Sequence, residues 1–500
     1  MPTTEARRAQ LAQPAQAAQR ATAAPLRRPC WIGATLAASL LCLAAGAVHA
    51  DVPLTIINLN DPGVGFNDST PAAPVGGNSG TTLGQQRLIA FTYAAEIWGG
   101  KLASTVPIRI GASFEPLTCT ASSATLGSAG ATNVYSDFAG AQLKGTWYSG
   151  ALASKLAGED VQDPATPHIR ARFNSRLGLA ADCLPGTLFY LGLDNAHGAN
   201  IDFVAVLLHE MAHGLGFQTF TSGLTGAYLG GQPSIWDHYL LDNRLNQTWV
   251  NLTAAQRAAS SLNDDGLSWT GPRVTNDAPA MLAAVSRLFV SGASAGTSAG
   301  TYPVGDAAFG PALASPAVTA QLMPVVDQAN GGGLACTTLS AINALAVKNN
   351  IALVDRGTCN FTVKALAVQA AGAKGVIVVD NVQADLTPLG GTDPAVAIPA
   401  VRVTLAAGTA IRAALAKRSR TASGVVASLG VDPTQLAGTD SAGRLLLYTP
   451  APYQSGSSVS HYDVSAKPNL LMEPSINGDL SHEVEAPRDL TMSLLEDIGW

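Results

Sequence analysis

The stretch HEMAHGLGF, His209 to Phe217, decides how the rest of the chain has to fold. His209 and His213 are four residues apart, so on an α-helix their imidazoles lie on one face, with Glu210 beside them. This spacing predicts a metal site with a general base next to it. The alternative is two histidines that merely share a buried helix. With 8 His in 500 residues, the motif arises by chance in about one such chain in a hundred or fewer.

The residues before this stretch predict the helix that the motif needs. Residues 203–208, FVAVLL, are apolar on every side, which is typical of a buried central helix. Asp202 or Asn200 can cap the helix start, because their side chains accept hydrogen bonds from free backbone amides. Gly214 and Gly216 can end it, since glycine adopts the left-handed conformation that closes a helix.

The N-terminal 50 residues have the pattern of a secretory signal peptide with a long front end. Five arginines precede an apolar run from Trp31 to Val48, and Val48-His49-Ala50 has small residues at the last and third-last positions. This pattern predicts cleavage after Ala50 and a secreted, extracellular protein. An uncleaved N-terminal anchor is the alternative, because a run of about 18 residues nearly spans a bilayer.

The charge of the remaining chain excludes some classes of partner. Removing residues 1–50 takes away five arginines and one glutamate and leaves a net charge of −10. An acidic body of this kind argues against nucleic acid as a partner. No later segment is long and apolar enough to cross a membrane, so we expect no membrane span after signal cleavage.

Four cysteines lie beyond the signal segment, and we expect two disulfides. Cys30 and Cys42 leave with the signal, whereas Cys119, Cys183, Cys336 and Cys359 remain. Four cysteines allow three pairings, between which sequence cannot choose. We expect Cys119–Cys183 and Cys336–Cys359, because each pair then lies within one proposed domain. Free buried thiols are the alternative.

The order of periodic segments before the motif indicates a mixed α/β fold. Residues 54–59 and 106–110 have strand patterns, as does the alternating stretch 168–174, and the short stretch TLFYLG reads as a further strand. Residues 85–98 have the periodicity of a helix. We therefore expect a twisted sheet backed by the motif helix. If 168–174 is an edge strand, it can pair with an extended peptide; a purely structural role is equally compatible.

Residues 218–305 carry weaker signals. Trp236-Asp237-His238 holds two side chains that can bind metal, although an ordinary helix or loop accounts for them equally simply. Helical stretches are expected near 253–262 and 278–290. The stretch SGASAGTSAG, residues 291–300, has the composition of a linker.

Residues 307–432 change character and resemble the protease-associated (PA) domain. The resemblance rests on IALVDRGTCNFTVKALAVQAAGAKGVIVVDN, residues 351–381, and on IPAVRVTLAAGTAI, residues 398–411. It implies a small β-rich domain without catalytic groups of its own, used for protein contact or for gating substrates. A simple spacer is the alternative, because the segment shows no ligand chemistry.

The motif stretch supplies only part of a catalytic zinc site, which usually has three protein ligands and an open fourth position. In the compact pattern HExxHxxGxxH, the third histidine would fall at Thr219, so the ligand must come from elsewhere. GSSVSHYDVSAKPNLLMEPSINGDL, residues 456–480, contains His461 and Met472. Together with HExxHxxGF this arrangement is similar to leishmanolysin, a metzincin family in which a long insertion precedes a histidine in a Gly-Ser-His context.

The resemblance to leishmanolysin implies a fold, a site and an activity. His461 becomes the third zinc ligand and Met472 the methionine of the turn beneath the metal, followed by a closing helix within LTMSLLEDIGW. The chain departs from that family by carrying a PA domain inside the insertion, so we expect a signal peptide at 1–50, a metallopeptidase domain at 51–306 and 433–500, and an inserted PA domain at 307–432. The implied protein is a secreted zinc endopeptidase acting on proteins or peptides, with Glu210 as general base.

Several alternatives stay open. His238 is the second choice for the third ligand, and His482 is expected to be a solvated neighbour. Asp432 and Asp440 could bind calcium, but their spacing matches no recognised loop. A different class of function is an exported binding or adhesion protein that uses the PA domain and carries a vestigial metal site.

Overall fold

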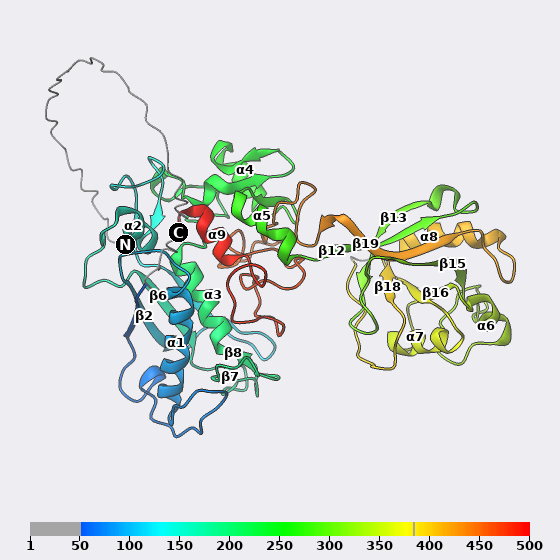
Figure 1. Cartoon of the computed structure of the whole chain (residues 1–500), viewed down its shortest axis with the longest axis horizontal. Helices are drawn as coiled ribbons and strands as arrows, with labels where there is room; N and C mark the ends of the chain where they lie inside the picture. The colour runs from blue at the N-terminus through cyan, green and yellow to red at the C-terminus, as the bar shows by residue number, and fades with distance from the viewer. Residues whose placement is uncertain (1–51, 384–385) are drawn as a thin grey trace, which may run out of the picture. The chain divides into compact units, whose positions relative to one another are not determined.

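The computed structural model describes residues 52–383 and 386–500 of the chain (Figure 1). The predicted signal peptide and its cleavage site after Ala50 lie outside the described residues. Within these residues, helices and several sheets are combined, so the expected mixed α/β class is confirmed. None of the helices in this part of the chain has the length and apolar content to cross a membrane.

The first sheet carries the N-terminal part of the chain, and its strand order is β1-β2-β6-β3. Its strands are β1 (Leu54–Asn58), β2 (Ile108–Glu115), β6 (Ile169–Asn174) and β3 (Gly127–Ala131). β1, β2 and β6 are parallel, with Ile110 opposite Ile169, and β3 is antiparallel to β6. Shorter elements surround it, namely β4 (Val134–Tyr135), β5 (Tyr148–Ser149), α2 (Gly150–Ala157), β7 (Phe189–Tyr190) and β8 (Ile201–Asp202).

The edge of this sheet differs from the sequence-based expectation. The stretch 168–174 forms the inner strand β6, which pairs with β2 on one side and with β3 on the other. The edge strands are β1 and β3, and the β3 sequence GSAGA lacks the β-branched and aromatic residues that mark a strand. Its pairing with β6, rather than its own composition, makes it a strand.

Two helices pack against this sheet and against each other (Figure 1). α1 (Leu83–Gly99) covers the predicted helix 85–98, and Thr82 caps it by accepting a hydrogen bond from the Gln85 amide. α3 (Phe203–Leu215) contains the two motif histidines. The indole of Trp98 donates to the Leu208 carbonyl at 3.2 Å, which joins the helices within the core.

Residues 218–283 form short elements around buried tryptophans. These elements are η3 (Trp236–Tyr239), β9 (Leu240–Asp242), β10 (Gln247–Thr248), α4 (Ala254–Ser260), β11 (Leu267–Trp269) and α5 (Pro272–Met281). The C-terminal helix α9 (Thr491–Ile498) lies beside α5. Asp497 of α9 accepts hydrogen bonds from the Trp269 indole and the Arg273 amide, so the end of the described chain is tied to this region.

The second sheet has eight strands in the order β13-β12-β19-β15-β16-β17-β18-β14. The strands are β12 (Ala284–Ser291), β13 (Gly300–Pro303), β14 (Gly305–Asp306), β15 (Val318–Pro324), β16 (Ile351–Asp355), β17 (Gly375–Val379), β18 (Ala400–Val403) and β19 (Val426–Leu436). Its helices are α6 (Ala341–Val347), α7 (Phe361–Ala370) and α8 (Leu405–Ala414). The central strands β15 to β18 are parallel.

The central strands β16, β17 and β18 of this second sheet are buried on both faces. In β16, Ile351 and Leu353 belong to one core cluster, whereas Ala352 and Val354 belong to another. Side chains alternate between the faces of a strand, so a fully buried parallel strand has to be apolar throughout. That requirement explains the continuous apolar runs in this part of the sequence.

Two expectations for residues 278–300 are wrong. The helix expected near 278–290 ends at Met281, and Ala284–Ser291 forms strand β12 instead. Pairing with β19 and β13 holds this segment in the second sheet. The expected linker, residues 291–300, is the connection between the paired strands β12 and β13. The second sheet therefore takes in residues before 307 and reaches Leu436 beyond 432.

The chain enters and leaves the second sheet at adjacent points. Ala284 pairs with Leu436, and the Ala437 amide donates to the Ala283 carbonyl at 2.8 Å. Residues 284–436 thus form an insertion whose two ends lie next to each other.

We expect that residues 284–436 can be replaced by a short glycine-serine linker without unfolding the remaining chain. The physical reason is that Ala283 and Ala437 are already hydrogen-bonded, so joining them requires little change in backbone position. Circular dichroism and a single cooperative thermal transition would show a folded product. A shortened chain that lacks such a transition would contradict the prediction.

Candidate metal centre

Local interactions fix where helix α3 starts and stops. The Asp202 carboxylate accepts hydrogen bonds from the Val204 and Ala205 amides at 2.8 and 3.2 Å, so Asp202 is the cap and Asn200 is not. Gly216, with φ of +131°, ends the helix, whereas Gly214 lies inside it. A β-carbon on Gly214 would come within 2.3 Å of the Ile169 side chain, so glycine lets α3 lie close to β6.

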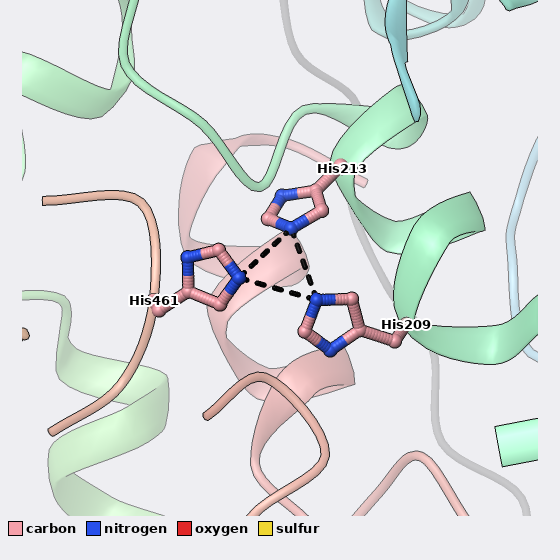
Figure 2. A group of neighbouring side chains, drawn as sticks. All are labelled: His209, His213 and His461. Atoms are coloured by element: carbon pink, nitrogen blue, oxygen red, sulfur yellow. Dashed lines mark hydrogen bonds between the residues drawn. The ribbon is translucent and has the colours of Figure 1, made fainter. Parts of the chain in front are cut away.

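His209, His213 and His461 meet at one point in the interior (Figure 2). Their Nε2 atoms are 3.2 Å apart for the pairs His209–His461 and His209–His213, and 3.3 Å apart for His213–His461. The three residues are 6%, 7% and 4% exposed, respectively. The structure therefore brings His461 to the two motif histidines across 248 residues of sequence.

The other nitrogen of each ring identifies its tautomer. The Nδ1 atoms of His209, His213 and His461 lie 2.8, 2.7 and 2.8 Å from backbone carbonyl oxygens of Leu471, Phe217 and Ser457. A carbonyl oxygen can only accept, so each Nδ1 carries the proton and each Nε2 presents a lone pair. Three lone pairs that face one another repel unless a cation lies between them.

The donor set fits a zinc ion. Burial lowers the pKa of His209 to about 4 and that of His213 to about 3, and burial also holds the pKa of His461 well below its usual value. Neutral imidazoles bind zinc at about 2.0–2.1 Å, and tetrahedral ligands at that distance stand about 3.3 Å apart. The observed separations are 3.2 to 3.3 Å. Carbonyl acceptors on the second ring nitrogen are also the usual support for such ligands.

Glu210 lies beside the three histidines and against strand β3. Burial raises the pKa of its carboxyl to about 8, although the Ala129 backbone amide and the positive charge of Arg172 act in the opposite direction. A β-carbon on Gly127 would lie 2.7 Å from the Glu210 Oε1 atom. Glu210 therefore occupies space that a larger residue at position 127 would fill.

The turn that contains Met472 lies next to the metal ligands. The Leu471 carbonyl accepts a hydrogen bond from His209 Nδ1, and the Leu471 amide donates to Asp489 at 2.7 Å. Met472 itself is fully buried, and its carbonyl accepts from the Tyr462 amide at 2.8 Å. The segment that supplies His461 and the turn at Met472 are thus hydrogen-bonded to each other.

The second choice for the third ligand, His238, lies elsewhere. Its Nε2 is 3.1 Å from the Thr146 hydroxyl, and Asp237 accepts hydrogen bonds from the hydroxyls of Thr219 and Thr221, both at 2.7 Å. Thr219, the residue at the compact motif's histidine position, also donates its amide to the Ser460 hydroxyl at 3.2 Å. It thereby fixes the loop next to His461, a role that its position in the sequence does not reveal.

His482 differs from the expected solvated neighbour. Its side chain is 11% exposed, and its Nε2 is 2.9 Å from the Asp202 carboxylate that caps α3. The candidate calcium ligands also have other partners, since Asp432 accepts from Thr434 and Asp440 pairs with Arg444. A separate group of carboxylates, Asp264, Asp265 and Asp463, lies together in the described part of the chain.

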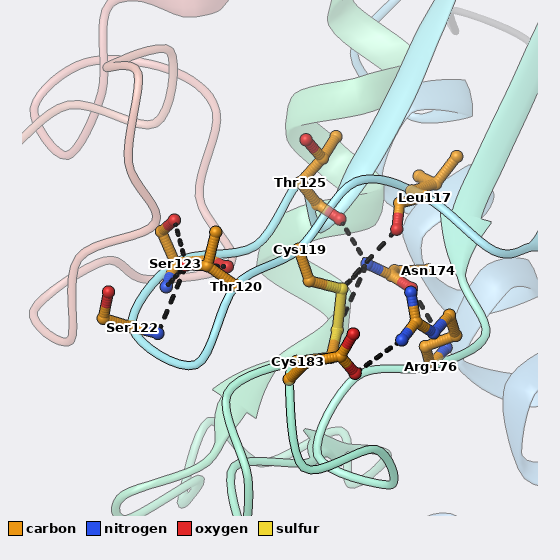
Figure 3. Close-up of a disulfide and its surroundings, with 10 residues drawn as sticks. Leu117, Cys119, Thr120, Ser122, Ser123, Thr125, Asn174, Arg176 and Cys183 are labelled. Carbon is orange, nitrogen blue, oxygen red and sulfur yellow. Dashed lines mark hydrogen bonds and ion pairs between the residues drawn. A yellow bond between two sulfur atoms is a disulfide. The ribbon is translucent and has the colours of Figure 1, made fainter.

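A cleft of about 810 Å³ opens beside the three histidines and Glu210. The Cys119–Cys183 disulfide holds its rim, because residues 122–129 and Leu184 line the cleft directly after the two cysteines (Figure 3). Asn174 donates to the Thr125 carbonyl at 2.9 Å in the same region. The second disulfide joins Cys336 to Cys359, so both bonds have the expected pairing.

Comparison with known proteins identifies one domain. Residues 318–411 match the PA domain family, so the expectation of a PA domain is confirmed. No curated protein sequence matches the chain.

Three solved structures show only partial similarity. An aminopeptidase from Aneurinibacillus sp. strain AM-1 is 24% identical with a TM-score of 0.23, covering 31% of this chain and 32% of that protein. BSAP, a zinc aminopeptidase from Bacillus subtilis, is 21% identical with a TM-score of 0.20, covering 32% and 36%. The subtilisin-like protease Apa1 from the Antarctic psychrotroph Pseudoalteromonas sp. AS-11 is 18% identical with a TM-score of 0.21, covering 33% and 35%. The chain thus spans about a third of the length of these proteins. The description of the histidine site above is therefore based on the geometry of this chain alone.

We expect the purified protein to bind about one zinc ion per chain. The His461→Ala variant should lose this zinc, because the two remaining imidazoles bind the ion much more weakly than three. Inductively coupled plasma mass spectrometry after dialysis measures this directly. His238→Ala is the matched control and should keep its zinc, since His238 contacts Thr146 instead. Full zinc content in the His461 variant would disprove the ligand set.

Proposed function

We propose that this chain is a secreted zinc-dependent endopeptidase that hydrolyses peptide bonds of proteins. The observation that carries the proposal is the convergence of three imidazole lone pairs beside the buried carboxylate of Glu210, at the wall of one cleft. Three neutral histidines with a neighbouring carboxylate are the groups that a metallopeptidase needs. The disulfides within the chain agree with export from the cell.

His209, His213 and His461 would hold the metal, and Glu210 would move the proton. When bound there, zinc would supply the polarisation of the scissile carbonyl and the lowered pKa of the attacking water. Glu210 accepts the proton of the attacking water and returns it to the leaving amine, as a general base and then a general acid. The carbonyls of Leu471, Phe217 and Ser457 keep the imidazoles in the orientation that this chemistry requires.

The free edge of β3 supports an endopeptidase. β3 pairs with β6 on one side only, and residues 127–129 of β3 line the cleft next to Glu210. An extended peptide can add to such an edge through main-chain hydrogen bonds. A peptide held in this way passes the metal centre in the middle of its length rather than at its end.

The finer assignment is a metzincin-type enzyme similar to leishmanolysin. Its support is the HExxHxxGF helix followed, after a long insertion, by His461 and the buried turn at Met472. Cleavage after Ala50 and release from the cell belong to the same proposal. The PA domain, with no catalytic groups of its own, would serve protein contact or substrate gating.

Replacing Glu210 by Gln should abolish casein hydrolysis while zinc stays bound. The amide keeps the size of the carboxylate but cannot accept the proton, and loss of general-base catalysis costs about 100-fold or more in rate. Casein digestion and metal analysis on the same preparation test both parts. If the wild-type protein binds zinc but digests no protein, the chain would instead be a binding protein with a vestigial site.

A smaller change on β3 should have a related effect. Gly127→Ala places a β-carbon 2.7 Å from the Glu210 Oε1 atom, so we expect the carboxylate to shift and activity to fall about tenfold with zinc content unchanged. Gly130→Ala on the same strand is the control, because its β-carbon meets the flexible end of Gln218 at 3.3 Å. Equal activity of the two variants would argue against this placement of Glu210.

A further inference from the structure

The walls of the cleft carry no charge apart from the catalytic carboxylate. Among the described residues that line it, Glu210 is the only carboxylate, and neither lysine nor arginine is present. The three histidines each place the Nδ1 proton on a backbone carbonyl and turn the Nε2 lone pair toward the other two, so they add no cationic wall to the cleft. The remaining side chains that line the cleft are neutral. Arg172, whose positive charge acts on Glu210, is exposed and lies outside the lining, where it donates a hydrogen bond to the hydroxyl of the lining residue Ser128 at 3.3 Å.

Neutral hydrogen-bonding groups take the place of charges. Eleven of the lining residues are serine or threonine. The hydroxyls of Ser122, Ser457 and Ser475 make no hydrogen bond within the described part of the chain, so they are available to a ligand. Gln218 also lines the cleft, and its buried Nε2 atom has no partner among the described residues. A buried amide donor without a partner is unfavourable, so a ligand that accepts from it gains a hydrogen bond at little cost.

We infer that the substrate class of this site is extended peptide segments whose side chains within the cleft are uncharged, with small polar residues preferred. This inference rests on the proposed peptidase function. A lysine or glutamate side chain that enters the cleft leaves water and finds no opposite charge on the walls, which is costly. A serine, glutamine or main-chain amide instead finds hydroxyls and the Gln218 amide. The neutral cleft also differs from the body of the protein, which is acidic overall.

The experiment compares fluorogenic peptides that differ in one side chain. The parent contains only Ser, Gln, Gly and Ala, and mass spectrometry locates the bond that is cleaved. Lys or Glu is then placed at each position on either side of that bond. We expect kcat/KM to fall at least tenfold for both charges near the bond. The fall should be less than twofold at the peptide ends, which lie in water.

Gln218→Glu tests whether the neutral walls cause the selection. The substitution keeps the size of the side chain and adds one negative charge to the cleft. The Lys-to-parent ratio of kcat/KM should rise at least fivefold, and the Glu-to-parent ratio should fall. Because each ratio is measured within one variant, changes in zinc content or overall rate cancel. Gln232→Glu, a half-buried glutamine outside the cleft, is the matched control and should leave both ratios unchanged.

The possible outcomes separate this inference from the proposed function. Wild-type protein that cleaves Lys or Glu peptides as fast as the parent overturns the inference and leaves a peptidase in place. Unchanged ratios in the Gln218 variant also overturn it. Failure to cleave any peptide, with zinc bound, overturns the proposed function and this inference with it.

Discussion

Three hydrogen bonds from imidazole Nδ1 atoms to backbone carbonyls are the interactions on which the centre of this molecule depends. Each bond fixes one tautomer, and together they turn three lone pairs toward one buried point. Phe217 and Ser457 each lie 4 residues from the histidine that they orient, whereas Leu471 lies 262 residues beyond His209, so the third bond forms only when the C-terminal segment has folded against helix α3. Three Nε2 lone pairs that face one buried point are a donor set that suits a bound cation.

Part of this arrangement could be predicted from the sequence. The spacing of His209 and His213 is a local property of a helix, and His461 and Met472 were found because their surrounding residues resemble a known family. The two disulfides followed from keeping each pair within one domain. These predictions depended on signals that lie within short stretches of sequence.

The remaining features depend on contacts between distant segments. Strand β3 has a composition without strand signal and is a strand only because β6 pairs with it. Thr219 donates its amide to Ser460 in the loop of His461 and its hydroxyl to Asp237, and no sequence motif indicates either contact. Residues 284–291 have an apolar pattern that fits a helix or a strand. They form a strand because they pair with β19. In each case a partner far along the chain supplies the deciding interaction.

The long separation between His213 and His461 follows from how helix α3 is buried. Every residue of the helix is buried, including the polar His209, Glu210 and His213, so the helix needs cover along its whole length. The C-terminal segment contacts it at three levels. His482 meets Asp202 at its start, the Leu471 carbonyl accepts from His209 in its middle, and the Trp500 indole donates to the Leu215 carbonyl at its end at 2.9 Å. His461 belongs to the same C-terminal segment that covers helix α3. Residues 284–436 start and end at the Ala283–Ala437 hydrogen bond. Their number therefore adds little to the conformational entropy that is lost when His461 is brought to His209 and His213.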